Sequence, residues 1–277
     1  MLERRIGFME TILYSVRNAV AEIAIARAPV NALDGATLQQ LLDALRRASA
    51  DSDVRVVLLH SAIAERFCAG LDLKLLREYR SSQLRSVLQK LYVELFDAKF
   101  NLGKPSIAAV SGATRGGGMT VAVSCDLVVA SATATFGYPE IDSGLLPAIH
   151  YVHLPRIVGR HRAFDLLFTG RAFSAREALD LGIINRVVED RDVVDEARDL
   201  AQTLASKPSA TLQRARAAFV SVIDQNYRRD IAAAVEQFCN VAADEEAREG
   251  ISAFSERRAP RWANSYNSIG LSDRQTK

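Results

Sequence analysis

The sequence predicts an α/β fold in which repeated β-β-α units form a spiral of small sheets, followed by a mainly helical region. Three observations favour this fold. The chain opens with segments typical of two strands, a helix and a further strand. Strand-like and helix-like segments then alternate around Gly-containing turns as far as Pro147. Beyond Pro147 the spacing of apolar residues becomes mostly helical.

The first predicted elements are a hairpin and an amphipathic helix. Within Thr11–Arg27, β-branched and aromatic residues alternate loosely with others, which predicts two strands joined at Arg17-Asn18. Asp34 is a favourable N-cap residue. Leucines follow it at the spacing of one helix face, and we expect this helix to end near residues 49–53. These leucines are Leu38, Leu41, Leu42 and Leu45.

The same order of elements then recurs. Val54–His60 is a continuous apolar run, which is typical of a strand buried on both faces. A helical stretch over about Lys74–Ala98 and a strand at Ser106–Val110 follow it. A Gly-rich turn leads to a short helix near Met119–Ser124 and then to a strand at Leu127–Ala130.

Helical periodicity dominates the last third of the chain. No Pro/Gly/Ser-rich linker precedes it, so we expect its helices to pack on the spiral core or on a neighbouring subunit. We expect the polar segment Asn264–Lys277 to be frayed. We therefore divide the chain into a core at residues 1–200 and a C-terminal helical region at residues 201–277. The helical segments are 162–168, 175–181, 193–204, 208–222 and 231–243, with a strand at 186–188.

The composition is that of an ordinary globular protein. Hydrophobic residues make up 49% of the chain and charged residues 25%, which excludes a mainly disordered protein. The net charge of +2 is too small to predict nucleic-acid binding. Three widely spaced cysteines fit neither a disulfide framework nor a metal site. Without an apolar run long enough to span a membrane, or a signal-peptide pattern, we expect a cytoplasmic, non-membrane protein.

Two Gly-containing turns are the strongest candidates for chemistry. One is Phe67–Lys74, around Gly70, and the other is Ser111–Gly118, which ends in three glycines. Both turns follow a predicted strand and lead into a helix, so their free N–H groups can converge on one developing negative charge. The chain lacks a phosphate loop, a dinucleotide-binding glycine pattern and a serine nucleophile elbow. These turns therefore predict an oxyanion hole.

Beyond these turns, a series of short motifs resembles the enoyl-CoA hydratase/isomerase (crotonase) family, in family order from about residue 29 to 262. The resemblance implies the crotonase-like ββα spiral, with a CoA-thioester site in the core. It also implies a homotrimer or homohexamer formed through the C-terminal helices, with no cofactor besides the CoA of the substrate. The motifs include Pro29–Leu33, Phe67–Lys74, Gly116–Gly118, Phe136–Glu140, Gly144–Pro147 and Glu249-Gly250.

The resemblance assigns roles to backbone groups and to residues that would bind CoA. The N–H groups of Leu71 and Gly117 would hold the thioester oxygen. Ala69, Leu71 and Asp72 would meet the adenine end of CoA. Arg257 and Arg258 would reach the CoA phosphates of a neighbouring subunit. An arginine pair that is only exposed to solvent is an equally good interpretation of these two residues.

The acid/base residues depart from the family pattern. Hydratases of the family use two glutamates, and Glu140 matches the second of them. Thr120 stands at the position of the first. A threonine cannot act as a carboxylate base, but its hydroxyl can orient a water molecule. We therefore expect Glu140 to act without a second carboxylate, in hydration or in double-bond isomerisation.

Several other polar residues near these motifs are candidates with open roles. Arg115 precedes the glycines and could pair with a substrate carboxylate or with Asp142. His150 could contact the substrate or take part in catalysis, with packing and helix capping as the alternatives. His150 and His153 stand three residues apart, but a third metal ligand is missing, so we expect no metal. Cys68 we interpret as a small packing residue.

Two alternative functions remain open from the sequence. One is a catalytically idle binding subunit, against which the retained Glu140 argues. The other is a C–C bond hydrolase that acts on a β-diketone without CoA, which the bulky segment around His150 keeps open. Asp126 and Asp142 we interpret as structural hydrogen-bond acceptors.

Overall fold

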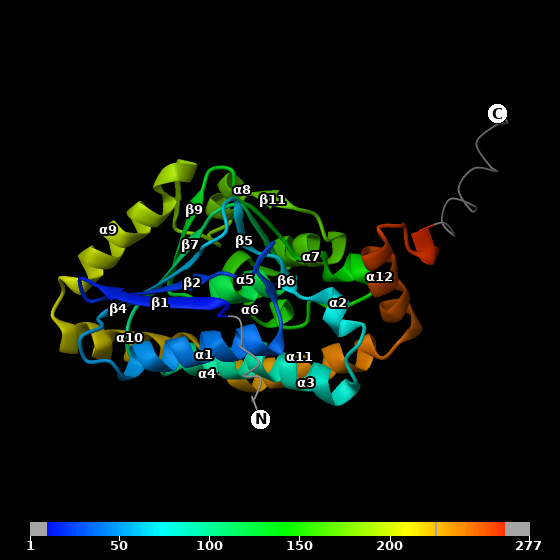
Figure 1. Cartoon of the computed structure of the whole chain (residues 1–277), viewed down its shortest axis with the longest axis horizontal. Helices are drawn as coiled ribbons and strands as arrows, with labels where there is room; N and C mark the ends of the chain where they lie inside the picture. The colour runs from blue at the N-terminus through cyan, green and yellow to red at the C-terminus, as the bar shows by residue number, and fades with distance from the viewer. Residues whose placement is uncertain (1–9, 225, 264–277) are drawn as a thin grey trace, which may run out of the picture.

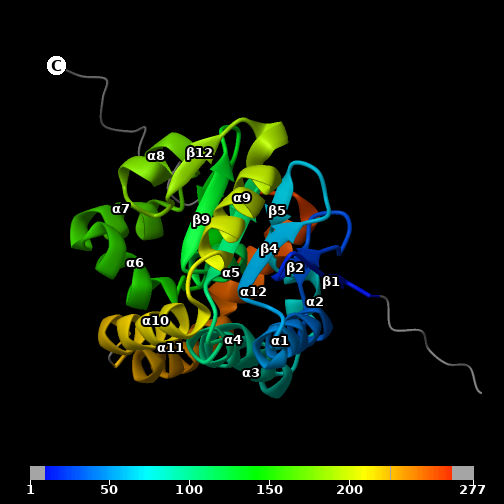
Figure 2. The same cartoon turned by 90° about the vertical axis from the view of Figure 1, so that its left-hand side faces the viewer.

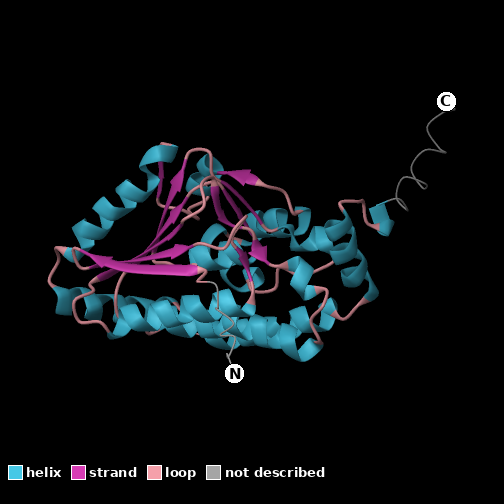
Figure 3. Cartoon of the chain, in the orientation of Figure 1, coloured by secondary structure: helices cyan, strands magenta, loops and turns pink. Residues whose placement is uncertain are grey.

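The computed structural model describes residues 10–224 and 226–263, so the expectation for Asn264–Lys277 lies outside the described residues. The strands form two sheets and a short pair (Figures 1 and 3). The large sheet has the order β1-β2-β4-β7-β9-β12, with an antiparallel β1-β2 hairpin and parallel neighbours after it. Its strands are β1 (Ile12–Arg17), β2 (Val20–Ile25), β4 (Val56–Ser61), β7 (Ser106–Val110), β9 (Leu127–Ser131) and β12 (Arg186–Val188).

The small sheet has the order β11-β10-β8-β5, and a parallel pair joins β3 to β6. Successive turns of the chain add one strand to each sheet: β4 then β5, β7 then β8, β9 then β10. This alternation confirms the predicted spiral of ββα units. The remaining strands are β3 (Ala32–Leu33), β5 (Arg66–Cys68), β6 (Gly70–Leu71), β8 (Ala113–Arg115), β10 (Thr135–Gly137) and β11 (Phe173–Ser174).

The helices of the first half of the chain pack against the sheets. Asp34 caps the first of them as predicted, because its side chain accepts a hydrogen bond from the Thr37 N–H at 2.7 Å. The elements are α1 (Gly35–Ala50), α2 (Leu73–Leu76), α3 (Ser81–Leu88), the π-helical η1 (Gln89–Glu94), α4 (Leu95–Phe100), α5 (Gly117–Val123) and the 3-10 helix η2 (Pro139–Ser143).

The later helices surround the second half of the core. In Figures 1 and 2, α10 and α11 lie along the same side of the molecule as α1, α3 and α4. Within the described residues, every helix is too short or too polar to cross a lipid bilayer. The elements are α6 (His150–Val158), α7 (Arg160–Thr169), α8 (Ala175–Asp180), the 3-10 helix η3 (Asp190–Asp192), α9 (Val193–Ala205), α10 (Ser209–Ile223), α11 (Tyr227–Ala242) and α12 (Glu245–Glu256).

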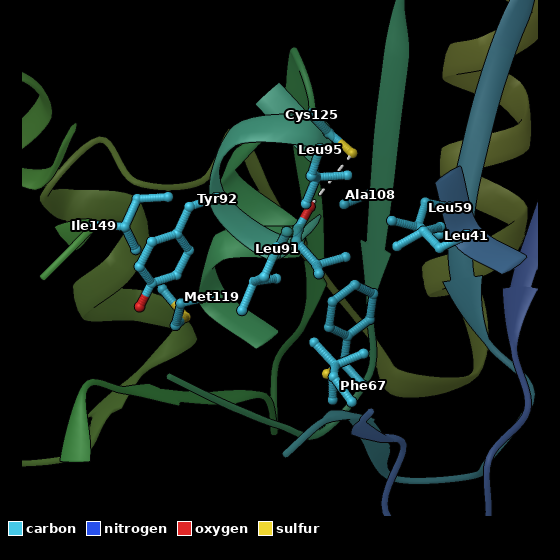
Figure 4. Close-up of a cluster of buried hydrophobic side chains, with 14 of the residues drawn as sticks. Leu41, Leu59, Phe67, Leu91, Tyr92, Leu95, Ala108, Met119, Cys125 and Ile149 are labelled. Carbon is cyan, nitrogen blue, oxygen red and sulfur yellow. Dashed lines mark hydrogen bonds between the residues drawn. The ribbon is translucent and has the colours of Figure 1, made fainter. Parts of the chain in front are cut away.

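The inner strands of the large sheet are buried on both faces, as the continuous apolar run at Val54–His60 predicts. Val56 and Leu58 pack against α9, while Val57 and Leu59 point into the main core on the other face. The spacing of four residues on α9 places small side chains toward the sheet: Val193, Ala197, Ala201 and Ala205. Figure 4 shows the main core, with Tyr92 and Ile149 at one end and Leu41 and Leu59 at the other.

Two helical predictions differ from the structure, and two helices were not predicted. The stretch expected at Lys74–Ala98 is broken after α2, because the Gln83 side chain accepts a hydrogen bond from the Arg80 N–H and starts α3. The helix expected near Met119 begins at Gly117. Neither α6 nor α12 was predicted, and α6 contains a proline, Pro155, which disfavours a helix in isolation. The division of the chain at residue 200 stays a prediction, and that residue lies within α9.

Candidate active site

The two predicted N–H donors belong to neighbouring elements, β6 and the start of α5, which lie side by side (Figure 1). A Cβ placed on Gly117 would be 3.4 Å from the Leu71 nitrogen, and one placed on Gly70 would be 3.1 Å from the Gly117 nitrogen. The fold therefore brings the N–H groups of Leu71 and Gly117 together.

Both N–H groups are free to bind a ligand. In the β3–β6 pair the Asp72 N–H donates to the Leu33 carbonyl at 2.9 Å. Because N–H groups alternate in direction along a strand, the Leu71 N–H points away from β3. Gly117 is the first residue of α5, and first-turn N–H groups have no acceptor within their own helix. The positive end of the helix dipole adds to this attraction for negative charge.

Gly116 sets the direction from which α5 starts. Its φ of +47° and ψ of −116° form a conformation that residues with a side chain rarely adopt. A Cβ at this position would also lie 2.9 Å from the Glu140 Oε1 atom. The carboxylate of Glu140 therefore lies directly against the turn that carries the Gly117 N–H.

Glu140 is held near the Gly116 turn by η2 and lies beside His150 on α6. The His150 Nε2 atom is 3.4 Å from Glu140 Oε1, and the two side chains are only 1% and 13% exposed. The His150 ring packs against Tyr138, with ring centroids 4.4 Å apart. The structure thus places His150 beside the predicted acid/base residue, which sequence spacing alone left open.

Buried polar atoms of Glu140, of the aromatic residues beside it and of Thr120 lack hydrogen-bond partners among the described residues. Each of these atoms could bind substrate or water in an occupied site. Burial raises the pKa of Tyr138 and lowers that of His153, because both charged forms are desolvated. The atoms are Thr120 Oγ1, Tyr138 Oη, Glu140 Oε2, His150 Nδ1 and Nε2, and His153 Nε2.

Helix α12 packs against η2, the 3-10 helix that carries Glu140. A Cβ on Gly250 would lie 2.2 Å from the Ser143 carbonyl oxygen, so only a glycine permits this approach. Arg258 then binds Glu249 through hydrogen bonds of 2.6 and 3.1 Å at the end of the helix. Glu249-Gly250, which the family resemblance singled out, thus positions the segment that carries Glu140.

The residues predicted to bind CoA have partners within the chain. Asp72 accepts a hydrogen bond from Arg27 at 2.8 Å and caps α2 through the Lys74 N–H at 3.2 Å. Arg258 binds Glu249, and Arg257 ends α12 in the left-handed conformation. The CoA contacts of these residues and of Ala69 stay predictions.

The pairing of Arg115 with Asp142 is wrong. The Arg115 guanidinium donates instead to the Thr114 and Thr135 carbonyls at 3.0 and 2.6 Å and to the Thr135 hydroxyl at 2.9 Å. These acceptors lie on Arg115's own strand and on β10, its neighbour in the small sheet, so the sheet holds the side chain. Contact with a substrate carboxylate stays a prediction. Burial raises the pKa of Asp142.

The structural roles predicted for Asp126 and Cys68 agree with the structure. Asp126 accepts hydrogen bonds from the Ser106 N–H and hydroxyl and from Arg216, at 2.7, 2.8 and 2.9 Å. Cys68 is fully buried and donates to the Asn31 carbonyl at 3.1 Å. Burial raises the pKa of the Cys68 thiol to about 12, which disfavours the reactive thiolate.

Sequence reasoning gave no role beside Glu140 and His150 to three side chains that the structure places there: Tyr92, Tyr138 and His153. Tyr138 lies in the Phe136–Glu140 motif, which was used to identify Glu140. His153 was considered only as a metal ligand. Tyr92 comes from the π-helical turn, a rare local structure that often occurs at functional sites. No group of three or more potential metal-ligating side chains occurs among the described residues, although the rings of His150 and His153 lie 5.0 Å apart.

Comparisons with known proteins show which family this chain belongs to. The family model described as enoyl-CoA hydratase/isomerase matches residues 15–265. A probable enoyl-CoA hydratase of Bacillus subtilis is 32% identical over 256 residues, which cover 92% of this chain and 99% of that protein. A carnitinyl-CoA dehydratase of Proteus mirabilis is 32% identical over 260 residues, which cover 91% and 98% of the two chains.

Solved structures show the same similarity. An enoyl-CoA hydratase/isomerase from Xanthobacter autotrophicus has a TM-score of 0.82 at 26% identity, covering 95% of this chain and 99% of that one. A carnitinyl-CoA dehydratase from Mycobacterium avium has a TM-score of 0.79 at 32% identity, covering 92% and 99%. The matches in sequence and in structure extend over nearly the whole chain. This protein therefore belongs to the enoyl-CoA hydratase/isomerase family and has the crotonase fold.

Proposed function

We propose that this protein moves a proton at the carbon next to the carbonyl of an acyl-CoA thioester, in enoyl-CoA hydration or double-bond isomerisation. The observation that carries the proposal is the junction of β6 and α5. There the free N–H groups of Leu71 and Gly117 meet, and the Glu140 carboxylate lies against the adjoining Gly116. The relatives named as hydratases and dehydratases of CoA esters support the substrate class.

The N–H pair addresses the difficult part of this chemistry. A thioester α-proton is weakly acidic, so its removal requires stabilisation of the enolate oxygen. Leu71 and Gly117 provide two fixed donors for that oxygen, an oxyanion hole, and removal of one such donor typically costs about 10²–10³ in rate. Both donors belong to the backbone, so they need no reorganisation when charge develops.

Glu140 is the proton carrier in this proposal. In hydration, water oxygen bonds to C3, the C2–C3 π electrons move to the thioester oxygen, and Glu140 takes the water proton and delivers it to C2. In isomerisation, Glu140 takes a proton from C2 of a 3-enoyl chain and returns it to C4. The unpartnered Thr120 hydroxyl would orient the water in the first reaction only.

We also propose that the protein assembles as a homotrimer or homohexamer. Helix α10 carries Phe219, Val222 and Ile223, which are 65%, 74% and 59% exposed. Exposed apolar side chains gathered on one helix favour an interface between subunits. Light scattering that finds a stable monomer at micromolar concentration would contradict this assembly.

Titration calorimetry separates the proposed function from its alternatives. We expect a 2-enoyl-CoA to bind, and the corresponding free acid and a β-diketone not to bind. Turnover of the 2-enoyl-CoA or of its 3-enoyl isomer then distinguishes an enzyme from an idle binding subunit. Binding of the diketone without binding of the thioester would favour the C–C hydrolase.

A further inference from the structure

A buried lysine that has no role in the proposed proton transfer lies at the wall of a cavity. The cavity has a volume of about 490 Å³ and is lined by side chains from η1, α4, α5, α6, α10 and α11. Lys99 lines it and is only 3% exposed. The ammonium group has three donors, but its one hydrogen bond runs to the Cys125 thiol at 3.1 Å. Among the described residues, no carboxylate forms an ion pair with Lys99.

The inner end of this cavity borders the candidate active site. Thr120 lines the cavity, and so does Leu91, whose Cδ2 atom would lie 3.0 Å from a Cβ on Gly117. His153 also lines it, and its ring contacts that of His150. An acyl chain whose carbonyl lies at Gly117 would therefore enter the cavity beyond Thr120.

The other cations around this cavity have carboxylate partners. Arg216 binds Asp126 at 2.9 Å, and Arg156 binds Asp230 on α11 at 3.0 Å. Asp224 also lines the cavity, where burial raises its pKa while the charges of Arg156 and Arg216 oppose that rise. Burial of a charge is costly without a partner. Lys99 thus differs from the two arginines, because its partner among the described residues is a thiol and not a carboxylate.

We propose, on the basis of the proposed function, that this cavity receives the acyl chain and that Lys99 binds an anionic group at its far end. The substrate class is a medium-length acyl-CoA with a terminal carboxylate. An α-helix rises about 1.5 Å per residue, so Val123, which lines the cavity, lies about 9 Å beyond Gly117 along the axis of α5. Cys125 follows Val123 by two residues and accepts the Lys99 hydrogen bond at 3.1 Å, so the end of a chain of this length would reach Lys99. The carboxylate would accept the unused Lys99 donors in a charge-assisted hydrogen bond.

Matched substrates test this inference on the whole protein. We would compare kcat/KM for trans-2-octenoyl-CoA and for its counterpart with a carboxylate in place of the terminal methyl group. The wild type should prefer the carboxylated thioester by about 10–100-fold, the usual value of a hydrogen bond to a charged group. Lys99→Met keeps the unbranched side chain and should abolish this preference, so that its kcat/KM values for the two thioesters become equal.

Lys90→Met is the matched control, because Lys90 binds Gln39 and lies outside the cavity. It should keep the wild-type preference. Equal or lower activity of the wild type toward the carboxylated thioester would overturn the inference, even if Lys99→Met fails to fold. Turnover of octenoyl-CoA alone would overturn the inference and leave the proposed function intact. No turnover of either thioester, in hexenoyl and decenoyl versions as well, would overturn both.

Discussion

Replacement of Gly116 by alanine tests the placement of Glu140 without altering Glu140 itself. In Gly116→Ala the new Cβ would lie 2.9 Å from Glu140 Oε1, where ordinary contact begins at 3.4 Å. The carboxylate must therefore retreat by a few tenths of an ångström. Since a misplacement of about 1 Å can cost about 10² in rate, we expect turnover to fall by about tenfold or more.

The same substitution also strains the backbone, and this effect needs a control. Gly116 has a φ of +47°, and a residue with a side chain in such a conformation costs about 1–3 kcal/mol. Gly182 has a φ of +76°, and a Cβ there would meet no atom within 4 Å. Gly182→Ala should therefore lose comparable stability in thermal unfolding and keep full activity.

The assay would measure α-proton exchange of an acyl-CoA in deuterated water, together with KM and the unfolding midpoint. We expect Gly116→Ala to lower kcat with little change in thioester binding. Equal activity of the two alanine variants would refute the reasoning, because it would mean that the position of Glu140 against Gly116 has no part in catalysis.

Three further predictions concern other residues. Thr120→Val removes the unpartnered hydroxyl at nearly constant side-chain volume. The rate of hydration of 2-enoyl-CoA should therefore fall, while the rate of isomerisation of 3-enoyl-CoA is retained. Equal loss of both activities would contradict a water-orienting role of Thr120. Hydrogen bonds from Arg258 lower the pKa of Glu249 to about 2, whereas the pKa in the unfolded chain is about 4.3. The Arg258–Glu249 pair therefore stabilises the fold above pH ~4.3, and this stabilisation is lost as the pH falls toward 2. In Arg258→Met, the free energy of unfolding measured in urea should depend less on pH between about 4.3 and about 2 than in the wild type. An unchanged dependence on pH would contradict the stabilising role of the Arg258–Glu249 pair. The Cys68 thiol should resist a thiol reagent at pH 8 in the folded protein, because burial raises its pKa to about 12. The partly exposed Cys239 should react under the same conditions. Faster labelling of Cys68 than of Cys239 would contradict this prediction, because it would show that the Cys68 thiol is accessible.

The strands were predictable where one physical pattern dominates. Ser106–Val110 was predicted with its observed bounds, because a continuous apolar run suits a strand covered on both faces. The start of α5 was predicted two residues late, because glycine has a low intrinsic helix propensity. Tertiary contact decides its position instead, since a Cβ on Gly118 would lie 2.3 Å from the Cys68 carbonyl oxygen.

The site was predictable in its backbone and less so in its side chains. Leu71, Gly117 and Glu140 follow from motifs that the family resemblance places in order. The contact between His150 and Glu140 depends on how the chain turns at Gly144 and enters α6, which sequence spacing does not determine. Arg115 finds its acceptors on the neighbouring strand β10, so its partners depend on sheet pairing.

The rate of α-proton exchange in Glu140→Gln tests the central claim most directly. Glutamine keeps the shape of the side chain but cannot accept the proton, so exchange of a bound acyl-CoA in deuterated water should fall by about 10²–10⁴, the usual contribution of a positioned general base. Thioester affinity measured by calorimetry should stay nearly unchanged, because the Leu71 and Gly117 donors are intact. Exchange at the wild-type rate in Glu140→Gln would contradict the claim that Glu140 carries the proton.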